Sequence, residues 1–300
     1  MRRTILKSLY KMSPFDLRGD CLVPPARDDI VVSCVINFYG RLDLLSGILH
    51  SLAQQDYPRE RFEVVLVEDR GGTPEGRAMA EEFSATLPIV YLPLDKNHGL
   101  MGYSRNFGLQ HSRGEYVLFL DDDTVLLQQD FLPRLEEQFA AQPKADAIVP
   151  HGQASFGVVA ERYDFHDPYF MTSRCTAYRR DVLAELGGFM SHFVGQEDVE
   201  FVTRFTIARK RAERCAALEY YHPPLLVPNS NKAKAVGASF YQLKGRYPSL
   251  VWLLVLVNCS RHAPLMYLPA RHHKEMGRFG WGVLLGVWEC MSGNKDFQYS

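Results

Sequence analysis

An apolar stretch that runs directly into three aspartates constrains this chain more than any other feature. Residues 116–120 are apolar or aromatic, and Asp121, Asp122 and Asp123 follow them without a break. A short apolar run of this kind is typical of a buried strand. Burying an unpaired carboxylate is very costly, so three of them at a strand end need partners. The stretch therefore favours a divalent cation with oxygen ligands and a phosphate beyond it, with a solvated acidic turn as the alternative.

Composition is that of a soluble globular protein. The 300 residues are 46% hydrophobic and 23% charged, and the net charge of −1 does not indicate a nucleic-acid partner. Six cysteines without a CxxC pair argue against a zinc site or a disulfide framework and favour a reducing compartment. Residues 1–12 do not form a convincing signal peptide, and no stretch reaches the roughly 18 apolar residues that span a bilayer. We therefore expect a cytoplasmic protein.

Strands and helices are predicted to alternate through the first part of the chain. Apolar runs predict strands over 30–36, 62–67, 89–92 and 116–120, and helical spacing predicts helices over 41–54, 74–86 and 101–111. This alternation predicts right-handed βαβ units and a parallel sheet. Polar clusters follow three of the strands, at the edge where such sheets bind ligands. Neither a GxGxxG motif nor a P-loop sequence follows the first strand.

The region after the aspartates has a less regular pattern. We expect a helix over 130–141, a strand over 147–149, an irregular substrate-facing segment over 151–172, a short helix over 180–186 and a strand over 216–221. Another helix is predicted to begin close to Asp198, where the helix dipole favours a carboxylate.

Residues 229–300 are basic, with nine Lys or Arg and three Asp or Glu. Two apolar bursts, at 250–257 and 281–288, are each too short to cross a bilayer. With their basic and aromatic flanks they suit helices that lie in a membrane interface, which would place the protein on the cytoplasmic face of a membrane. The alternative is that both bursts pack on the rest of the protein as core.

The motifs between residues 30 and 222 together resemble those of the family 2 glycosyltransferases. In order, they include Glu68-Asp69, Asn97-His98-Gly99, Ser104-Arg105-Asn106, Asp121-Asp122-Asp123, Gly187-Gly188-Phe189 and Glu197-Asp198. The resemblance implies a GT-A fold, an α/β structure with a Rossmann-like, mostly parallel sheet flanked by helices, here with a mostly helical C-terminal extension. It also implies a lead-in segment over 1–29, a catalytic domain over 30–228 and an extension over 229–300. Within the catalytic domain, 30–123 would be the nucleotide-binding half and 124–228 the acceptor half.

The resemblance assigns one group of residues to the nucleotide. Asp69 corresponds to the carboxylate that hydrogen-bonds the base, usually uracil. Asn37 and Tyr39 would line the base pocket, and Arg105 would approach the nucleotide. Asn97 and Gly99 come from the motif that lies between Asp69 and Arg105 in the sequence, and they belong to the same donor site.

The resemblance assigns a second group to the diphosphate and the chemistry. Asp122 would contact the ribose and Asp123 the metal, with Asp121 nearby. His222 matches a histidine that completes the metal shell in many GT-A enzymes, although a histidine at a strand end is more often structural. Asp198 matches the catalytic base.

Together these roles imply an inverting glycosyltransferase. It would move a sugar from a nucleotide-diphosphate sugar, typically UDP-linked, to a hydroxyl of a saccharide or lipid-linked acceptor in cell-surface polysaccharide or glycolipid synthesis. Mn²⁺ or Mg²⁺ would neutralise the leaving diphosphate, and one carboxylate would take the acceptor proton. The chain departs from the family pattern at Asn37, Gly40, residues 70–72 and Thr124, which leaves the base and the sugar open.

Three other functions are compatible with parts of the pattern. A sugar nucleotidyltransferase also uses a metal on a nucleotide, but the basic Gly-rich loop that would favour it is missing after the first strand. A non-catalytic binding module of the same fold would be favoured by loss of Asp123 or Asp198, and both are present. An aspartate-nucleophile phosphatase would need its nucleophile after the first strand, where this chain has Asn37.

Overall fold

One mixed eight-stranded sheet organises the protein. The computed structural model describes residues 3–27, 29–153, 169, 171–223 and 230–293. The strand order is β3-β2-β1-β4-β7-β6-β8-β5. The strands are β1 (Val32–Phe38), β2 (Phe62–Glu68), β3 (Ile89–Pro93), β4 (Tyr116–Asp121), β5 (Val125–Leu126), β6 (Ala147–Gln153), β7 (Cys175–Arg179) and β8 (Ala212–Tyr221).

The predicted βαβ units form the first half of this sheet. Strands β1 to β4 are parallel to one another, and they alternate with α2 (Leu42–Ala53), α3 (Pro74–Phe83) and α4 (Met101–His111). The predicted strands and helices of this half are confirmed to within a few residues at each end. Val35 pairs with Val65 on one side and with Phe119 on the other, so β1 lies at the centre. Apolar strand residues are buried because helices cover both faces.

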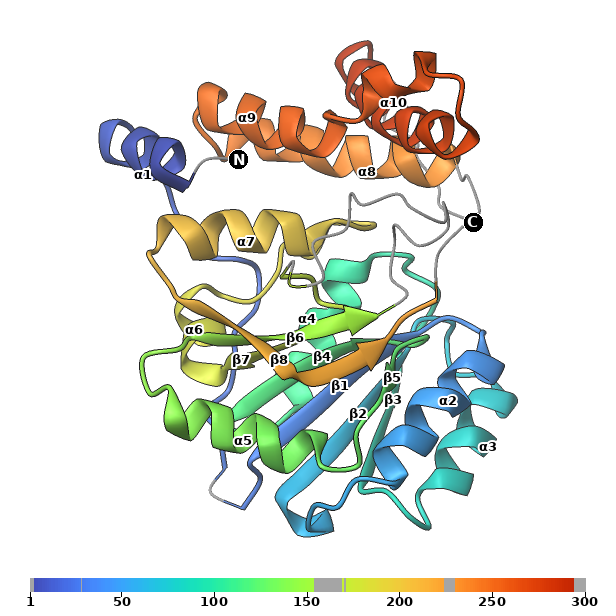
Figure 1. Cartoon of the computed structure of the whole chain (residues 1–300). Helices are drawn as coiled ribbons and strands as arrows, with labels where there is room; N and C mark the ends of the chain where they lie inside the picture. The colour runs from blue at the N-terminus through green and yellow to red at the C-terminus, as the bar shows by residue number, and fades with distance from the viewer. Residues whose placement is uncertain (1–2, 28, 154–168, 170, 224–229, 294–300) are drawn as a thin grey trace.

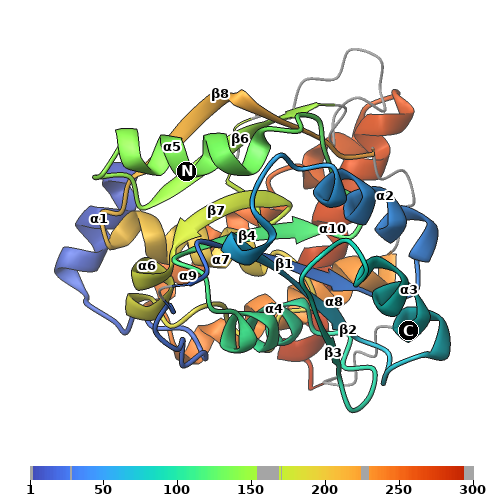
Figure 2. The same cartoon turned by 90° about the horizontal axis from the view of Figure 1, so that it is seen from below.

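Each face of the sheet packs into its own apolar cluster. Cys34 and Ile36 point into a cluster with α2, α3 and α5 (Phe131–Ala141), whereas Val35 points into a cluster with α4, α6 (Arg180–Glu185) and α7 (Glu197–Ile207). This alternation is the period of two that strand geometry imposes. Figure 2 shows α5 and α4 on opposite sides of the central strands.

The second half of the sheet is mixed rather than parallel. Strand β7 is antiparallel to both β4 and β6, β6 is parallel to β8, and β5 is antiparallel to β8. Strands β5 and β7 were not predicted, because β5 has two residues and β7 mixes polar and apolar residues without a clear alternation. The expected irregular segment over 151–172 begins instead as the end of β6, and its residues 154–168 and 170 lie outside the described residues.

The N-terminal segment contains a helix that the sequence analysis did not predict. Helix α1 (Arg3–Met12) contacts α7, and the chain that follows it docks against a glycine turn. The amides of Gly19 and Cys21 donate to the carbonyls of Leu186 and Gly187, at 2.7 and 2.9 Å. Gly187 has a φ of +62°, a conformation that glycine adopts without strain.

Residues 230–293 form a helical layer beyond α7, which Figure 1 shows in orange and red. Its helices are α8 (Ser230–Gln242), α9 (Ser249–Ser260) and α10 (Arg271–Met291), with short 3₁₀ turns η3 (Leu243–Gly245) and η4 (Ala263–Tyr267). Helices α8 and α10 approach closely, since a Cβ on Gly237 would collide with the carbonyl oxygen of Val283. The inner faces of the layer pack on α1 and α7 in a third apolar cluster, as the core alternative predicts.

One part of this layer corrects an expectation from the sequence. The segment Ser249–Tyr267 is long and apolar enough to cross a membrane by length and composition alone, with a mean hydropathy of 1.2 over its best window. The expectation that no stretch reaches this length is therefore wrong. A core helix meets the same criterion, and 33% of that window is buried inside the protein.

A buried ionic cluster joins the helical layer to α7. The side chains of Arg204 and Glu200, one turn apart on α7, are fully buried and form an ion pair of 2.7 Å. Arg204 also donates to the carbonyl of Leu186 at 2.6 Å, and the hydroxyl of Tyr247 donates to Glu200. Because Tyr247 lies between η3 and α9, this cluster ties the C-terminal layer to the helix that carries Asp198.

Candidate active site

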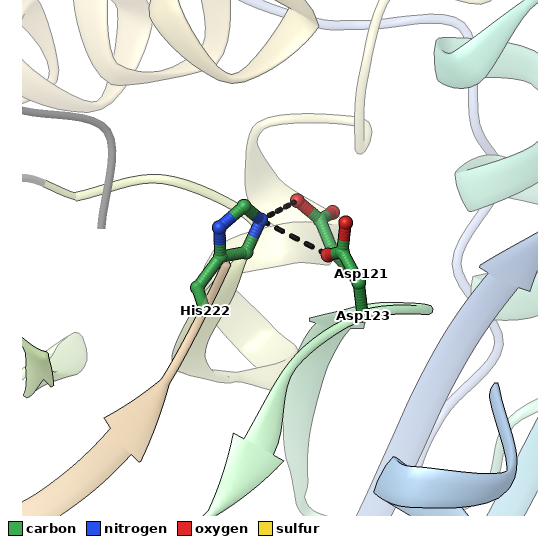
Figure 3. A group of neighbouring side chains, drawn as sticks. All are labelled: Asp121, Asp123 and His222. Atoms are coloured by element: carbon green, nitrogen blue, oxygen red, sulfur yellow. Dashed lines mark ion pairs between the residues drawn. The ribbon is translucent and has the colours of Figure 1, made fainter. Parts of the chain in front are cut away.

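The three aspartates lie at the end of β4, close to the end of β8. Asp121 is the last residue of β4, and His222 follows the last residue of β8. Nε2 of His222 lies 3.0 Å from Oδ1 of Asp123 and 3.6 Å from Oδ2 of Asp121 (Figure 3). Ligand atoms from these three side chains all lie within 4.8 Å of one another. The sequence predicted each of the three for the metal site or its surroundings, and the fold brings them together.

The donor set fits a divalent cation. Asp123 and His222 are almost completely buried, and within the described part of the chain Oδ1 of Asp123 and Nδ1 of His222 make no hydrogen bond of good geometry. Two carboxylates and an imidazole are suitable ligands for Mn²⁺, and Mg²⁺ prefers the carboxylate oxygens. A buried carboxylate oxygen without a hydrogen bond is an acceptor for such an ion.

Electrostatics at the strand end reflect the crowding of three carboxylates. Burial raises the pKa of Asp122 to about 7, and Asp123 and Asp121 add to the rise against the opposing charge of Arg41. Burial also acts to raise the pKa of Asp121, but the nearby imidazole of His222 and the charge of Arg105 outweigh it and lower that pKa. Burial lowers the pKa of His222, and its two aspartate partners more than reverse this. A bound cation would favour the ionised form of all three aspartates.

Arg105 connects this group to the predicted catalytic base. Its Nη2 donates to Oδ1 of Asp121 at 2.7 Å, and its Nε lies 3.0 Å from Oε1 of Glu197. The guanidinium is nearly buried and stands 6.0 Å from the centre of the Phe189 ring. The structure thus places Arg105 between the aspartates and α7, and the approach to a nucleotide stays a prediction.

Asp198 occupies the first turn of α7, as predicted. Its Oδ1 accepts the amide of Val199 at 2.8 Å, and its Oδ2 accepts the amide of Ser173 at 3.4 Å. Gln196, which immediately precedes α7, has a φ of +61°, so a sharp turn sets the direction of the helix start. Burial raises the pKa of Asp198 above its usual range, and the charge of Arg105 opposes this.

Glu197 is a neighbour whose individual role the sequence did not reveal. It is buried, and burial raises its pKa to about 7, although the ion pair with Arg105 acts in the opposite direction. Glu197 is paired with Arg105 and Asp198 is half-buried, and the role of Asp198 as the base stays a prediction. The adjacent acids in the sequence were the only signal for this division of roles.

Asp69 shapes the loop that carries Asn97 and Gly99. Its two carboxylate oxygens accept the amides of His98 and Gly99, at 2.7 and 3.1 Å, and the hydroxyl of Ser104 at 3.1 Å. Three donors hold this carboxylate, and Gly99 has a φ of +61° at the turn. The structure therefore gives Asp69 a role in the loop, and its contact with a base stays a prediction.

The remaining predicted donor residues lie around the same loop. Nδ2 of Asn97 lies 3.3 Å from the hydroxyl of Tyr39, whose ring is covered by the guanidinium of Arg70 at 5.2 Å. Asn37 ends up beside Met101, and its buried Oδ1 has no hydrogen-bond partner in the described residues. Tyr39 is still 51% exposed, and an exposed ring and an unpaired amide oxygen are groups that a base can use.

Arg41 is a residue of this site that the sequence analysis did not assign. It follows Gly40 in the loop after β1, and it forms ion pairs with Asp122 and Asp123. The sequence signal that could have assigned Arg41 to the site is a basic residue in a loop at the ligand-binding edge of the sheet. No spacing rule pairs it with aspartates about 80 residues away.

The fold and the site define an α/β protein with a GT-A fold. Two solved structures support this class. Residues 1–349 of TarS from Staphylococcus aureus superpose with a TM-score of 0.56 and 18% identity, over 88% of this chain and 92% of that one. The mannosyltransferase PcManGT from Pyrobaculum calidifontis superposes with a TM-score of 0.59 and 16% identity, over 96% of this chain and 95% of that one. The expected fold is therefore confirmed.

The family follows from the sequence. The model of glycosyl transferase family 2 matches residues 33–187, more than half of the chain, and the chain belongs to that family. The succinoglycan biosynthesis protein ExoM of Rhizobium meliloti is 30% identical over 175 residues, 53% of this chain and 56% of that protein. The glycosyltransferase AglE of Haloferax volcanii is 26% identical over 59% of this chain and 62% of its own length. The poly(ribitol-phosphate) beta-N-acetylglucosaminyltransferase TarS is 35% identical over 94 residues, which are only 16% of its length.

Proposed function

We propose that this protein is an inverting glycosyltransferase that moves a sugar from a nucleotide-diphosphate sugar to an acceptor hydroxyl. The observation that carries the proposal is the path from the Asp121, Asp123 and His222 group through Arg105 to the first turn of α7. It places a candidate cation site and a candidate base in one connected set of charges. Membership of a glycosyltransferase family supports the reaction class.

In this proposal Asp121, Asp123 and His222 hold a divalent cation, Mn²⁺ or Mg²⁺. When bound, the cation supplies positive charge to the diphosphate that leaves the sugar. Asp198 accepts the proton of the acceptor hydroxyl through a carboxylate oxygen. One base without a second nucleophile corresponds to a single displacement, which inverts the anomeric carbon. Arg105 and Glu197 hold α7 at a fixed distance from the aspartates.

The donor site is proposed to take a UDP-sugar. Asn37, Tyr39 and Asn97 would face the base, beside the loop that Asp69 holds at Gly99, and Asp122 would bind the ribose. A TarS structure contains UDP-GlcNAc, and the PcManGT structure contains GDP-Man with Mn²⁺. The chemistry on the diphosphate is the same for either base.

The acceptor is proposed to be a saccharide or a lipid-linked saccharide of cell-surface polysaccharide. Relatives named for succinoglycan and O-antigen biosynthesis support this class. We divide the chain into a lead-in segment over 1–29, a catalytic unit over 30–228 with its donor half ending at residue 123, and an extension over 229–300. A cytoplasmic location suits a nucleotide-sugar donor.

The extension is further proposed to contact an anionic membrane surface. On α10, Lys274, Arg278, Trp281 and Trp288 fall on one face at helical spacing, and all four side chains are exposed. Trp281 is 42% exposed and Trp288 65%. Exposed tryptophans next to basic residues suit the headgroup region of an anionic bilayer.

A screen of nucleotide sugars tests the reaction class. Each sugar is mixed with the purified protein and Mn²⁺ or Mg²⁺, and thermal stabilisation and slow hydrolysis are measured. Release of a nucleoside diphosphate supports the proposal. Release of pyrophosphate would identify a nucleotidyltransferase, and stabilisation without turnover on any acceptor would identify a binding module.

A further inference from the structure

Arg41 covers the carboxylates after β4 from the solvent side. Its Nη1 donates to Oδ2 of Asp123 at 2.8 Å, and its Nη2 pairs with Oδ1 of Asp122. The side chain of Arg41 is 44% exposed, whereas those of Asp122 and Asp123 are 6% and 2% exposed. A half-exposed guanidinium therefore closes off two buried carboxylates.

The loop geometry explains how Arg41 reaches them. Asn37 in β1 pairs with Asp121 in β4, so the ends of the two strands lie side by side. The chain then turns at Gly40, whose φ of +81° a residue with a side chain adopts only with strain. A Cβ there would also lie 2.8 Å from Nη1 of Arg70. The turn places Arg41 over the end of β4.

Both oxygens of Asp123 consequently face a basic side chain. Oδ2 accepts from Arg41, and Oδ1 lies 3.0 Å from Nε2 of His222. A divalent cation that uses Asp123 has to share it with Arg41, and like charges at this separation repel. A nucleoside diphosphate carries negative charge that attracts both the cation and the guanidinium, so it relieves the repulsion.

We propose that Arg41 competes with the divalent cation for Asp123 and so makes cation binding depend on the nucleoside diphosphate. The inference rests on the proposed donor site. It adds a positioning residue that couples the binding of the two ligands. Such coupling is reciprocal: the diphosphate strengthens cation binding by the same factor as the cation strengthens diphosphate binding.

The Arg41→Gln variant separates competition from a purely structural ion pair. Without the guanidinium, Mn²⁺ alone should bind about threefold to fivefold more tightly, which is the scale of a partly exposed ion pair. The factor by which UDP strengthens Mn²⁺ binding should fall. A structural role predicts the opposite, because losing a support for Asp122 and Asp123 would weaken Mn²⁺ binding.

The experiment is a Mn²⁺ titration followed by electron paramagnetic resonance of the free ion, without nucleotide and with UDP or GDP. Arg61→Gln is the matched control, because Arg61 is 41% exposed and forms a 2.8 Å ion pair with Glu136 away from the site. Unchanged or weaker Mn²⁺ binding in Arg41→Gln, with intact binding in the wild type, overturns the role of Arg41 alone. If no protein binds Mn²⁺ with or without nucleotide, the cation site and this inference both fail.

Discussion

Nε of Arg105 lies 3.0 Å from Oε1 of Glu197, and this ion pair joins the helix of the proposed base to the aspartates of β4. The same guanidinium donates to Asp121, so one buried side chain spans both groups. Arg105 lies on α4, and α7 begins about 90 residues later. The two elements meet because both pack on the same face of the sheet.

The first prediction concerns the base. Asp198→Asn should reduce transfer by roughly 10²–10⁴-fold, the usual scale of general-base catalysis, with donor affinity nearly unchanged. The base acts on the acceptor hydroxyl and not on the nucleotide. Transfer rate and nucleotide-sugar affinity are measured on the purified variant. Near-normal transfer would mean that Asp198 only supports the first turn of α7, and parallel loss of donor binding would also count against the base.

The second prediction concerns the cation. Asp123→Asn should weaken Mn²⁺-dependent binding of UDP by about tenfold or more, the scale seen when a metal site loses a supporting group. The amide keeps the shape of the side chain, so the unfolding temperature should change little. Calorimetric titration with and without Mn²⁺ measures the effect, and Asp130→Asn, in an exposed ion pair with Arg134, is the control. Unchanged Mn²⁺-dependent binding would remove Asp123 from the site.

The third prediction concerns the exposed face of α10. Replacing Trp281 and Trp288 together by Ala should abolish flotation with liposomes that contain anionic lipid, because interfacial aromatic residues and basic residues act together at such surfaces. Wild-type flotation should fall as salt is raised. The matched control replaces the exposed Leu22 and Leu127, which lie outside the helical layer, by Ala. Equal flotation of both double variants, or none of the wild type, would contradict membrane contact.

The fourth prediction concerns the link between α7 and the helical layer. Tyr247→Phe removes the hydroxyl that donates to the buried Glu200, so the free energy of unfolding should fall by about 1.5–3 kcal/mol. Urea denaturation measures the change. Tyr57→Phe is the comparison, since Tyr57 donates to Glu136 at 2.7 Å and the side chain of Glu136 is 30% exposed. If the free energy of unfolding fell more in Tyr57→Phe than in Tyr247→Phe, the buried cluster would not be what stabilises the helical layer.

The sequence by itself determined the first half of the fold, and it predicted which residues form the candidate site. Apolar runs and helical spacing predicted β1 to β4 and α2 to α4 because each pattern depends on neighbours in the chain. Their order then implied parallel strands, and polar residues after parallel strands meet at one sheet edge. That rule alone predicts that Asp69 and the three aspartates lie at the same edge.

Only the tertiary structure decided which charged groups touch. Arg41 forms ion pairs with Asp122 and Asp123, and Glu197 forms one with Arg105, because strand order and helix packing bring distant segments together. The antiparallel β7 and the buried inner face of the C-terminal helices were decided in the same way. A periodic apolar pattern shows that a face is buried, but what covers it depends on the path of the whole chain.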